Sequence, residues 1–186
     1  TVDTRGVEQW EKNLLAALDG RKVDYLVVSH LEPDHAGSIG RLVELFPEVT
    51  LVGNAKTFQM LPQFFDELPV DENHKITVAE GESLSLGTHT LNFYMAPMVH
   101  WPEVMVTYES SEKILFSADG FGKFGALDYE DPEGWACEAR RYYFNIVGKY
   151  GTFVQKLLKK LQTLDVKMIC PLHGPVWRSN LEYFIE

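Results

Sequence analysis

The segment His30-Leu31-Glu32-Pro33-Asp34-His35 holds the residues best suited to chemistry in this chain. Four of its six positions are His, Glu or Asp, which are ligand types for metal ions. Two imidazoles and two carboxylates placed this closely would repel or leave groups unpaired, and a bound cation would relieve that cost. A solvated loop or a helix cap could contain a single His-x-Glu. Four ligand types in one short segment instead favour a metal site.

Three further candidate ligands each follow an apolar run that is expected to form a strand. His100, Asp119 and His173 come a few residues after such runs, as His30 does after the run 25–28. Loops at strand ends carry chemistry in α/β folds, so we expect these loops to converge at one edge of the sheets. Asp119 alone could be a turn residue, and His173 alone could be a core histidine. Their shared placement favours a role in the site.

The complete candidate set contains more groups than one ion can bind. It consists of four histidines and three carboxylates: His30, Glu32, Asp34, His35, His100, Asp119 and His173. This set exceeds the needs of one four-coordinate ion and suits two ions that share a bridging carboxylate. The remaining histidines, His74 and His89, lie in polar or strand contexts, and we expect them to be solvated or packed.

Hydrophobic periodicity indicates the elements that must position these residues. In the first part of the chain helices and strands alternate, which is typical of stacked α/β units. The expected elements are helix 7–18, strand 25–28, helix 39–46, strand 49–52 and helix 55–65, which Pro62 kinks or shortens. The segment 30–35 is then expected on a strand-to-helix loop.

The middle of the chain changes to short apolar runs separated by turns. This pattern predicts a β-meander of strands 76–78, 83–87, 89–95, 104–108 and 114–116. A long loop is expected over 119–131, followed by two helices within 135–164 that break near 148–151. A last strand is expected at 166–170.

Length and composition favour one globular domain over residues 1–186, with 45% hydrophobic residues. No transmembrane window or secretory signal is apparent, so we expect no membrane association. A formal net charge of −10 would repel phosphate backbones and argues against nucleic-acid binding. Cys137 and Cys170 lack metal-binding or disulfide-framework spacing, which indicates buried thiols in a reducing, cytoplasmic setting.

The motifs together resemble the metallo-β-lactamase superfamily, whose pattern is His-x-[His/Glu]-x-Asp-His followed by a distant His, an Asp and a final His. Within that superfamily the chain looks like the flavodiiron proteins. The features that carry this resemblance are Glu32, where hydrolases have a second His, and the runs 100–103 (HWPE), 115–122 (LFSADGFG) and 170–177 (CPLHGPVW). The resemblance covers nearly the whole chain.

The resemblance implies an αββα sandwich with two iron ions at one edge of its two sheets. One iron would be bound by His30, Glu32 and His100, the other by Asp34, His35 and His173, with Asp119 as the bridge. Such a site would reduce dioxygen to water, or nitric oxide to nitrous oxide. A carboxylate in place of an imidazole also suits iron better than zinc. Trp101 and the loop 121–124 are candidates for the pocket wall and equally for ordinary core aromatics.

The resemblance also implies parts that these 186 residues do not contain. Family members have a flavodoxin-like domain that carries FMN, and several strands that precede the position of Thr1. We therefore expect this chain to be a piece of a longer protein, or to be completed by another chain. Family dimers pack head to tail, so that one subunit's FMN feeds the other's irons. Rubredoxin or a reduced flavin cofactor would donate the electrons.

Two other functions are compatible with a similar ligand set. A dinuclear zinc hydrolase of the same fold would use a metal-bound hydroxide against a thioester, a lactam or a phosphodiester. A non-catalytic di-iron sensor would bind oxygen and signal through partners. Glu32 argues against the hydrolase, as does the absence of a basic run in the sequence.

Overall fold

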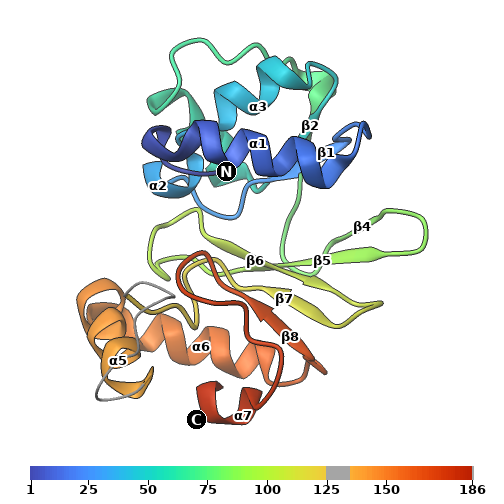
Figure 1. Ribbon diagram of the computed structural model, residues 1–186. Coiled ribbons are helices and arrows are strands. Elements are labelled where there is room, and N and C mark those ends of the chain that lie inside the picture. Colours follow the sequence, from blue (N-terminus) through green and yellow to red (C-terminus); the bar gives the residue numbers. More distant parts are fainter. Residues whose placement is uncertain (125–134, 186) are drawn as a thin grey trace. The chain divides into compact units, whose positions relative to one another are not determined.

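A computed structural model describes residues 1–124 and 135–185 of the chain (Figure 1). The chain forms two compact units, Thr1–Val78 and Ala79–Glu186, which are called the first unit and the second unit below. Each unit has its own sheet, its own helices and its own buried apolar cluster.

The first unit is built from parallel strands and short helices. Its three-stranded sheet has the order β1 (Tyr25–Val27), β2 (Thr50–Gly53), β3 (Lys75–Thr77), and both pairings are parallel. The helices are α1 (Val7–Leu18), α2 (Pro33–Ala36), α3 (Ile39–Leu45) and α4 (Ala55–Met60). Short 3-10 turns cover Thr4–Gly6, Leu61–Gln63 and Glu72–His74.

Apolar residues at helical spacing explain how these helices pack. Ile39, Leu42 and Val43 lie on one face of α3 and are buried in the same cluster as Leu51 of β2, against which Trp10 of α1 packs. Helix α1 ends where Asp19 adopts a left-handed conformation with φ 49°, directly after the predicted helix end at residue 18. Burial of these faces fixes the position of the loop that leaves β1.

The second unit contains a five-stranded sheet of mixed direction. The strand order is β4 (Ser83–Ser85), β5 (Thr90–Met95), β6 (Met105–Glu109), β7 (Ile114–Phe116), β8 (Met168–Cys170). The first three pairings are antiparallel, and β7 pairs with β8 in parallel. Strands β5, β7 and β8 therefore run in the same direction, so their carboxyl ends share one edge of this sheet.

Three helices accompany this sheet: α5 (Trp135–Ile146), α6 (Gly151–Leu161) and α7 (Leu181–Ile185). Figure 1 shows α5, α6 and α7 on the same side of the five-stranded sheet. Val154 and Leu157 of α6 pack against a buried cluster that includes Val106 and Ile169 of the sheet. A 3-10 turn at Gly148–Tyr150 separates α5 from α6, so the predicted break near 148–151 is confirmed.

Most predicted elements are present, and one strand is placed differently. Strand 76–78 was expected in the meander, but β3 pairs in parallel with β2 and belongs to the first unit's sheet. The segment from α4 through the 3-10 turns is the crossover that a parallel pair requires. Helix α4 ends at Met60, before Pro62, so the prediction that Pro62 kinks or shortens this helix is confirmed. The predicted loop 119–131 is described only as far as residue 124.

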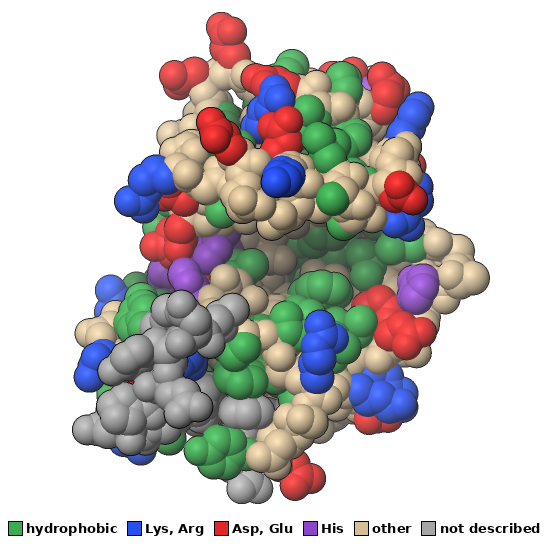
Figure 2. All heavy atoms as spheres, in the orientation of Figure 1, with side chains coloured by type: hydrophobic (Ala, Val, Ile, Leu, Met, Phe, Trp, Pro, Cys, Tyr) green, Lys and Arg blue, Asp and Glu red, His purple; other side chains and the backbone are tan. Residues whose placement is uncertain are grey.

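The surface of the first unit carries charges of both signs. Figure 2 shows acidic and basic side chains interspersed on its visible face rather than a continuous basic patch. Within the ranges 1–124 and 135–185, no helix combines the length and the apolar character needed to cross a membrane.

Candidate functional site

The first unit holds one cluster of candidate ligands, at the carboxyl end of β1. The backbone N–H of Val28 donates to the Val52 carbonyl at 2.8 Å, which extends the parallel pairing to the point where His30 begins the loop. Glu32 is the N-cap of α2, and Pro33 occupies the first helical turn, where its missing N–H costs nothing. The segment was expected to be a loop throughout. Asp34 and His35 instead lie on α2, which fixes their backbone.

Imidazole and carboxylate groups pair within this first cluster. His30 Nε2 lies 3.3 Å from Glu32 Oε2, and His35 Nε2 lies 3.3 Å from Asp34 Oδ2. The two imidazole rings have centroids 5.9 Å apart. Both histidines are buried, at 3% and 8% exposure, whereas the two carboxylates are partly exposed. The rings are therefore held by packing, and the acids supply negative charge beside them.

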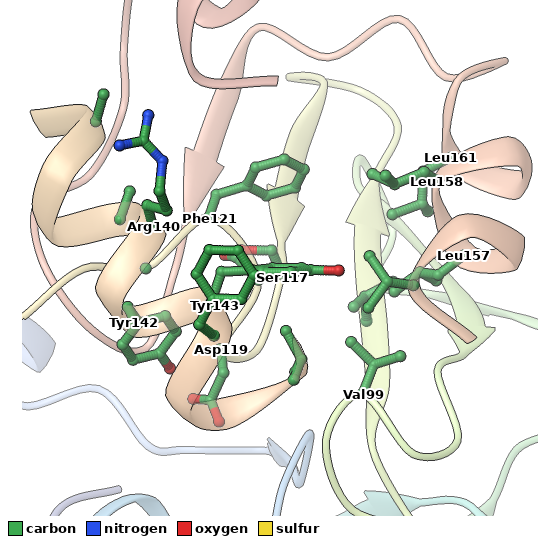
Figure 3. Close-up of a pocket in the computed structure, with 18 of the residues that line it drawn as sticks. Val99, Ser117, Asp119, Phe121, Arg140, Tyr142, Tyr143, Leu157, Leu158 and Leu161 are labelled. Atoms are coloured by element: carbon green, nitrogen blue, oxygen red, sulfur yellow. The ribbon is translucent and has the colours of Figure 1, made fainter. Parts of the chain in front are cut away.

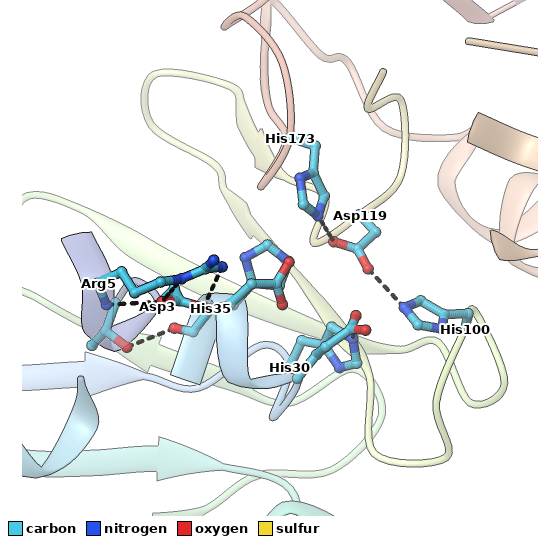
Figure 4. Close-up of polar contacts among 10 residues, drawn as sticks. Asp3, Arg5, His30, His35, His100, Asp119 and His173 are labelled. Atoms are coloured by element: carbon cyan, nitrogen blue, oxygen red, sulfur yellow. Dashed lines mark hydrogen bonds and ion pairs between the residues drawn. The ribbon is translucent and has the colours of Figure 1, made fainter. Parts of the chain in front are cut away.

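The N-terminal residues form hydrogen bonds with the segment that carries His35. The hydroxyl of Thr1 donates to the His35 carbonyl at 2.6 Å, and the hydroxyl of Ser38 donates to the Val2 carbonyl at 2.9 Å. Figure 4 shows His30 and His35 with the N-terminal residues beside them. These two bonds tie Thr1 and Val2 to the segment 35–38, which holds the backbone that carries His35.

The second unit holds the other cluster, at the shared edge of β5, β7 and β8. Phe116 of β7 pairs with Cys170 of β8, and Asp119 and His173 each follow their strand by three residues. The parallel register therefore brings these two side chains together. His100 arrives at the same edge from β5. The expected convergence of strand-end loops is thus present for these three loops of the second unit.

Asp119 lies between two imidazoles in this second cluster. His100 Nε2 is 3.0 Å from Asp119 Oδ2, and His173 Nε2 is 3.7 Å from Asp119 Oδ1 (Figure 4). Asp119 is 4% exposed, so water screens its charge little. A buried carboxylate with one histidine at each oxygen is suited to bridge two ions.

Backbone contacts between two loops hold Asp119 and His173 in place. The Leu172 N–H donates to the Ala118 carbonyl at 2.8 Å, and the indole N–H of Trp177 donates to the Phe121 carbonyl at 3.0 Å. Ala118 has φ 50° and Phe121 has φ 64°, conformations that cost non-glycine residues about 1 kcal/mol each. The loop-to-loop bonds offset this cost and keep Asp119 oriented.

Aromatic side chains border the second cluster. The Trp101 ring lies edge-on to His100 with centroids 6.1 Å apart, and Phe124 packs edge-on to Tyr142 at 4.9 Å. The Tyr142 ring in turn lies 5.5 Å from the His173 ring. Tyr142 was not singled out from the sequence, because nothing in its helical pattern distinguishes it from its neighbour Tyr143.

His74 and His89, which were expected to be solvated or packed, each pair with one carboxylate. His74 Nδ1 lies 3.0 Å from the Asp71 carboxylate in a 3-10 turn, and His89 Nδ1 lies 3.3 Å from Glu109 in the second unit's sheet. Cys137 and Cys170 are free thiols of intermediate exposure, so they are less buried than the sequence predicted. Burial raises the pKa of the Cys170 thiol, which disfavours a reactive thiolate and agrees with a packing role.

Each cluster has the chemistry and spacing of metal ligands. Two ligand atoms that are each ~2.1 Å from one ion, at about a right angle, lie ~3 Å apart. The contacts of 3.0 to 3.3 Å between imidazole and carboxylate atoms in both units match that separation. Mixed nitrogen and oxygen donors of this kind suit iron and zinc. The donor sets therefore fit iron, the metal that the sequence resemblance implies.

The two sheets with their helices have the architecture of a metallo-β-lactamase-like fold, and the loops at the strand ends carry groups that could hold metal ions. The model of the ODP family beta lactamase matches residues 3–174, and the chain belongs to that family. The predicted metallo-β-lactamase-like fold class and the predicted resemblance to flavodiiron proteins are thereby confirmed.

Known proteins similar to this chain point the same way. A nitric oxide reductase of Moorella thermoacetica is 36% identical over 96% of this chain and 47% of its own length. The rubredoxin oxygen:oxidoreductase of Desulfovibrio gigas has a TM-score of 0.88 at 29% identity, covering 100% of this chain and 48% of that one. The flavodiiron protein of Giardia intestinalis has a TM-score of 0.87 at 28% identity, covering 100% and 46%. The chain thus spans less than half the length of these proteins.

Proposed function

We propose that the two units together form the di-iron domain of a flavodiiron protein, which reduces dioxygen to water or nitric oxide to nitrous oxide. One observation carries the proposal: in each unit, imidazole and carboxylate groups from the segments that follow the strands lie paired with one another. The names of the similar proteins, a nitric oxide reductase and a rubredoxin oxygen:oxidoreductase, support the reaction class.

In this proposal all seven candidate residues are ligands. His30, Glu32 and His100 would hold one iron, Asp34, His35 and His173 would hold the other, and Asp119 would join both. Bound iron supplies electrons to the gas, which the protein itself cannot do. Burial of His30 and His35 keeps their rings in place, and burial of Asp119 strengthens its attraction for cations.

The electrons come from outside this chain in the proposed reaction. FMN on a flavodoxin-like domain would pass them to the site, and rubredoxin or a reduced flavin cofactor would reduce the FMN. Reduction of dioxygen to two waters takes up four electrons and four protons. Reduction of two nitric oxide molecules to nitrous oxide and one water takes up two of each. A head-to-tail homodimer would bring the FMN of one subunit to the irons of its partner.

Metal analysis combined with gas consumption tests this proposal. Protein from iron-replete cells is expected to contain two irons per chain, and after reduction it should consume dioxygen or nitric oxide through many turnovers. Asp119→Asn should lose metal and gas consumption, because a neutral amide cannot bridge two cations. Asp66→Asn, a matched change of an exposed aspartate, should change neither.

Three outcomes would contradict the proposal. Two zinc ions per chain with no gas consumption would favour the hydrolase, and hydrolysis of an ester panel would then identify it. Gas binding without turnover would favour the sensor. Retention of both irons by Asp119→Asn would remove the bridging role.

A further inference from the structure

The second unit contains a cavity of about 510 Å³ that the proposed reaction has not used. It lies among α5, α6 and the strand-end loops, and Figure 3 shows leucines of α6 on one side of it and tyrosines of α5 on the other. Its walls are mainly aliphatic and aromatic, and include Val99, Val106, Tyr143, Val147, Leu157 and Leu158. Such a lining offers water few hydrogen bonds.

Besides three tyrosines, Tyr142, Tyr143 and Tyr183, the cavity wall contains the polar side chains of Asp119, Ser117 and Arg140. Asp119 is part of the wall, and Figure 3 shows its carboxylate next to Tyr142, whereas Arg140 lies at a different side of the cavity. The hydroxyl of Ser117 donates to the Gly120 carbonyl at 2.7 Å, so it is already occupied within the loop. The cavity is therefore an apolar space that reaches the carboxylate expected to bridge the irons.

We propose that this cavity holds apolar diatomic gas and delivers it to the Asp119 end of the site. The proposal rests on the function proposed above, and it names the route by which the substrate arrives. Apolar cavities exclude water and bind apolar guests: one engineered cavity of about 150 Å³ stays dry and takes up xenon. Dioxygen and nitric oxide are small and weakly polar, so they partition from water into such a space for the same reason.

The location of the cavity adds a kinetic consequence. Gas held beside Asp119 is already close to the reacting centre, so its local concentration exceeds that in solution. Filling the cavity should reduce the rate of gas capture and leave later steps unchanged. In steady state this is a rise in KM for the gas with little change in kcat.

Xenon binding gives a test that does not depend on catalysis. The full chain, with and without metal, is labelled at Leu and Val methyl groups and titrated with xenon. Methyl signals of Val147, Leu157 and Leu158 are expected to shift and to saturate, while those of Leu42 and Leu51, which are buried in the first unit, should not. Absence of saturable shifts at the cavity methyls would overturn the proposal.

Leu158→Trp tests the role of the cavity, because it places a large ring in that space. Gln155→Trp is its matched control, since Gln155 lies on the exposed face of the same helix. In stopped-flow mixing of the reduced protein with dioxygen, Leu158→Trp should lower the second-order rate constant about fivefold, and Gln155→Trp should not. The milder Val154→Phe should give a smaller loss in the same direction and serves if the first variant does not fold.

These measurements separate failure of this proposal from failure of the function. Saturable xenon shifts in a protein that consumes no gas would leave the cavity as an apolar site and refute the reaction. Normal gas consumption with unchanged rate constants in Leu158→Trp and Val154→Phe would refute the delivery route alone. Iron content is measured for every variant, and a loss of iron in Leu158→Trp would also count against a role limited to gas capture.

Discussion

Glu32 is the single residue that most affects which metal the first cluster selects. Its carboxylate lies 3.3 Å from His30 Nε2 and is one-third exposed, so it can reach an ion without a large burial cost. Carboxylate oxygen is a harder ligand than imidazole nitrogen and favours iron relative to an all-nitrogen set. The hydrolases of the superfamily carry a second His at this position.

Glu32→His is therefore expected to shift the metal content toward zinc. We expect the ratio of iron to zinc in protein expressed with equal supplies of both metals to fall about tenfold, which corresponds to ~1.4 kcal/mol. Elemental analysis of the purified protein measures this ratio. Glu48→His, at an exposed position outside the cluster, is the control and should leave the ratio unchanged. An unchanged ratio in Glu32→His would show that the carboxylate does not select the metal.

At the scale of elements, the turn between β6 and β7 depends on one buried acid. Glu109 accepts the backbone N–H groups of Ser111 at 2.8 Å and Glu112 at 2.6 Å. Burial raises the pKa of Glu109, but the hydrogen bonds from Glu112, Ser111 and His89 lower it by more than burial raises it. The resulting pKa is about 2, against an ordinary value of 4.5. The ionised form is thus the one that stabilises the turn.

This pKa predicts how stability depends on pH. Because the folded pKa is depressed, the contribution is complete above about pH 4.5 and is lost as the pH falls toward 2. Glu109→Gln should lower the free energy of unfolding by ~2 kcal/mol at pH 7, and the difference from wild type should shrink at pH 3. Urea titrations at both values measure it. Glu112→Gln, in the same turn but exposed, should show no such dependence.

Two glycines give opposite predictions for the same substitution. A Cβ at Gly122 would lie 3.0 Å from the Asp119 carbonyl oxygen and 3.3 Å from the His173 Cβ, whereas one at Gly40 in α3 would meet no heavy atom within 4 Å. Gly40→Ala should stabilise the protein by ~0.5–1 kcal/mol, because alanine loses less entropy in a helix. Gly122→Ala should weaken metal binding about tenfold by displacing the loops that hold Asp119 and His173. Thermal melts and metal titrations of both variants check this, and normal metal affinity in Gly122→Ala would be contrary to it.

Local patterns predicted most elements but not every pairing. The helix at 7–18 and the break near 148–151 are each determined by residues close together in the sequence, and the structure confirms both. The partner of strand 76–78 depends instead on a crossover without clear periodicity, so its place beside β2 could not be predicted. The same limit applies to Tyr142, which lies near His173 only because α5 packs beside that loop.

The whole molecule divides its candidate ligands between two units. The first unit carries His30, Glu32, Asp34 and His35, and the second carries the other three. Their positions after predicted strands identified these residues as candidate ligands, and the structure pairs imidazole with carboxylate groups within each unit. Whether one ion takes ligands from both units stays a prediction, and it has a consequence for stability. An ion that is bound by both units stabilises them jointly against unfolding.

Removal of one ligand from either unit should therefore have the same effect. His30→Gln and His100→Gln are each expected to reduce iron from two to about one per chain, since both residues are proposed to bind the same ion. At an ion concentration about 100 times Kd, a bound ion contributes ~2.7 kcal/mol, so each variant should lose about 5–11 °C of the metal-dependent rise in Tm.

The double variant distinguishes a shared ion from two separate ones. If His30 and His100 bind the same ion, the double variant should retain about as much iron, and as much metal-dependent rise in Tm, as either single variant, because residues that act as a unit are not additive. His89→Gln is the control, since His89 pairs with Glu109 away from both clusters. A double variant that loses the second iron, or twice the Tm rise, would mean that each unit binds its own ion.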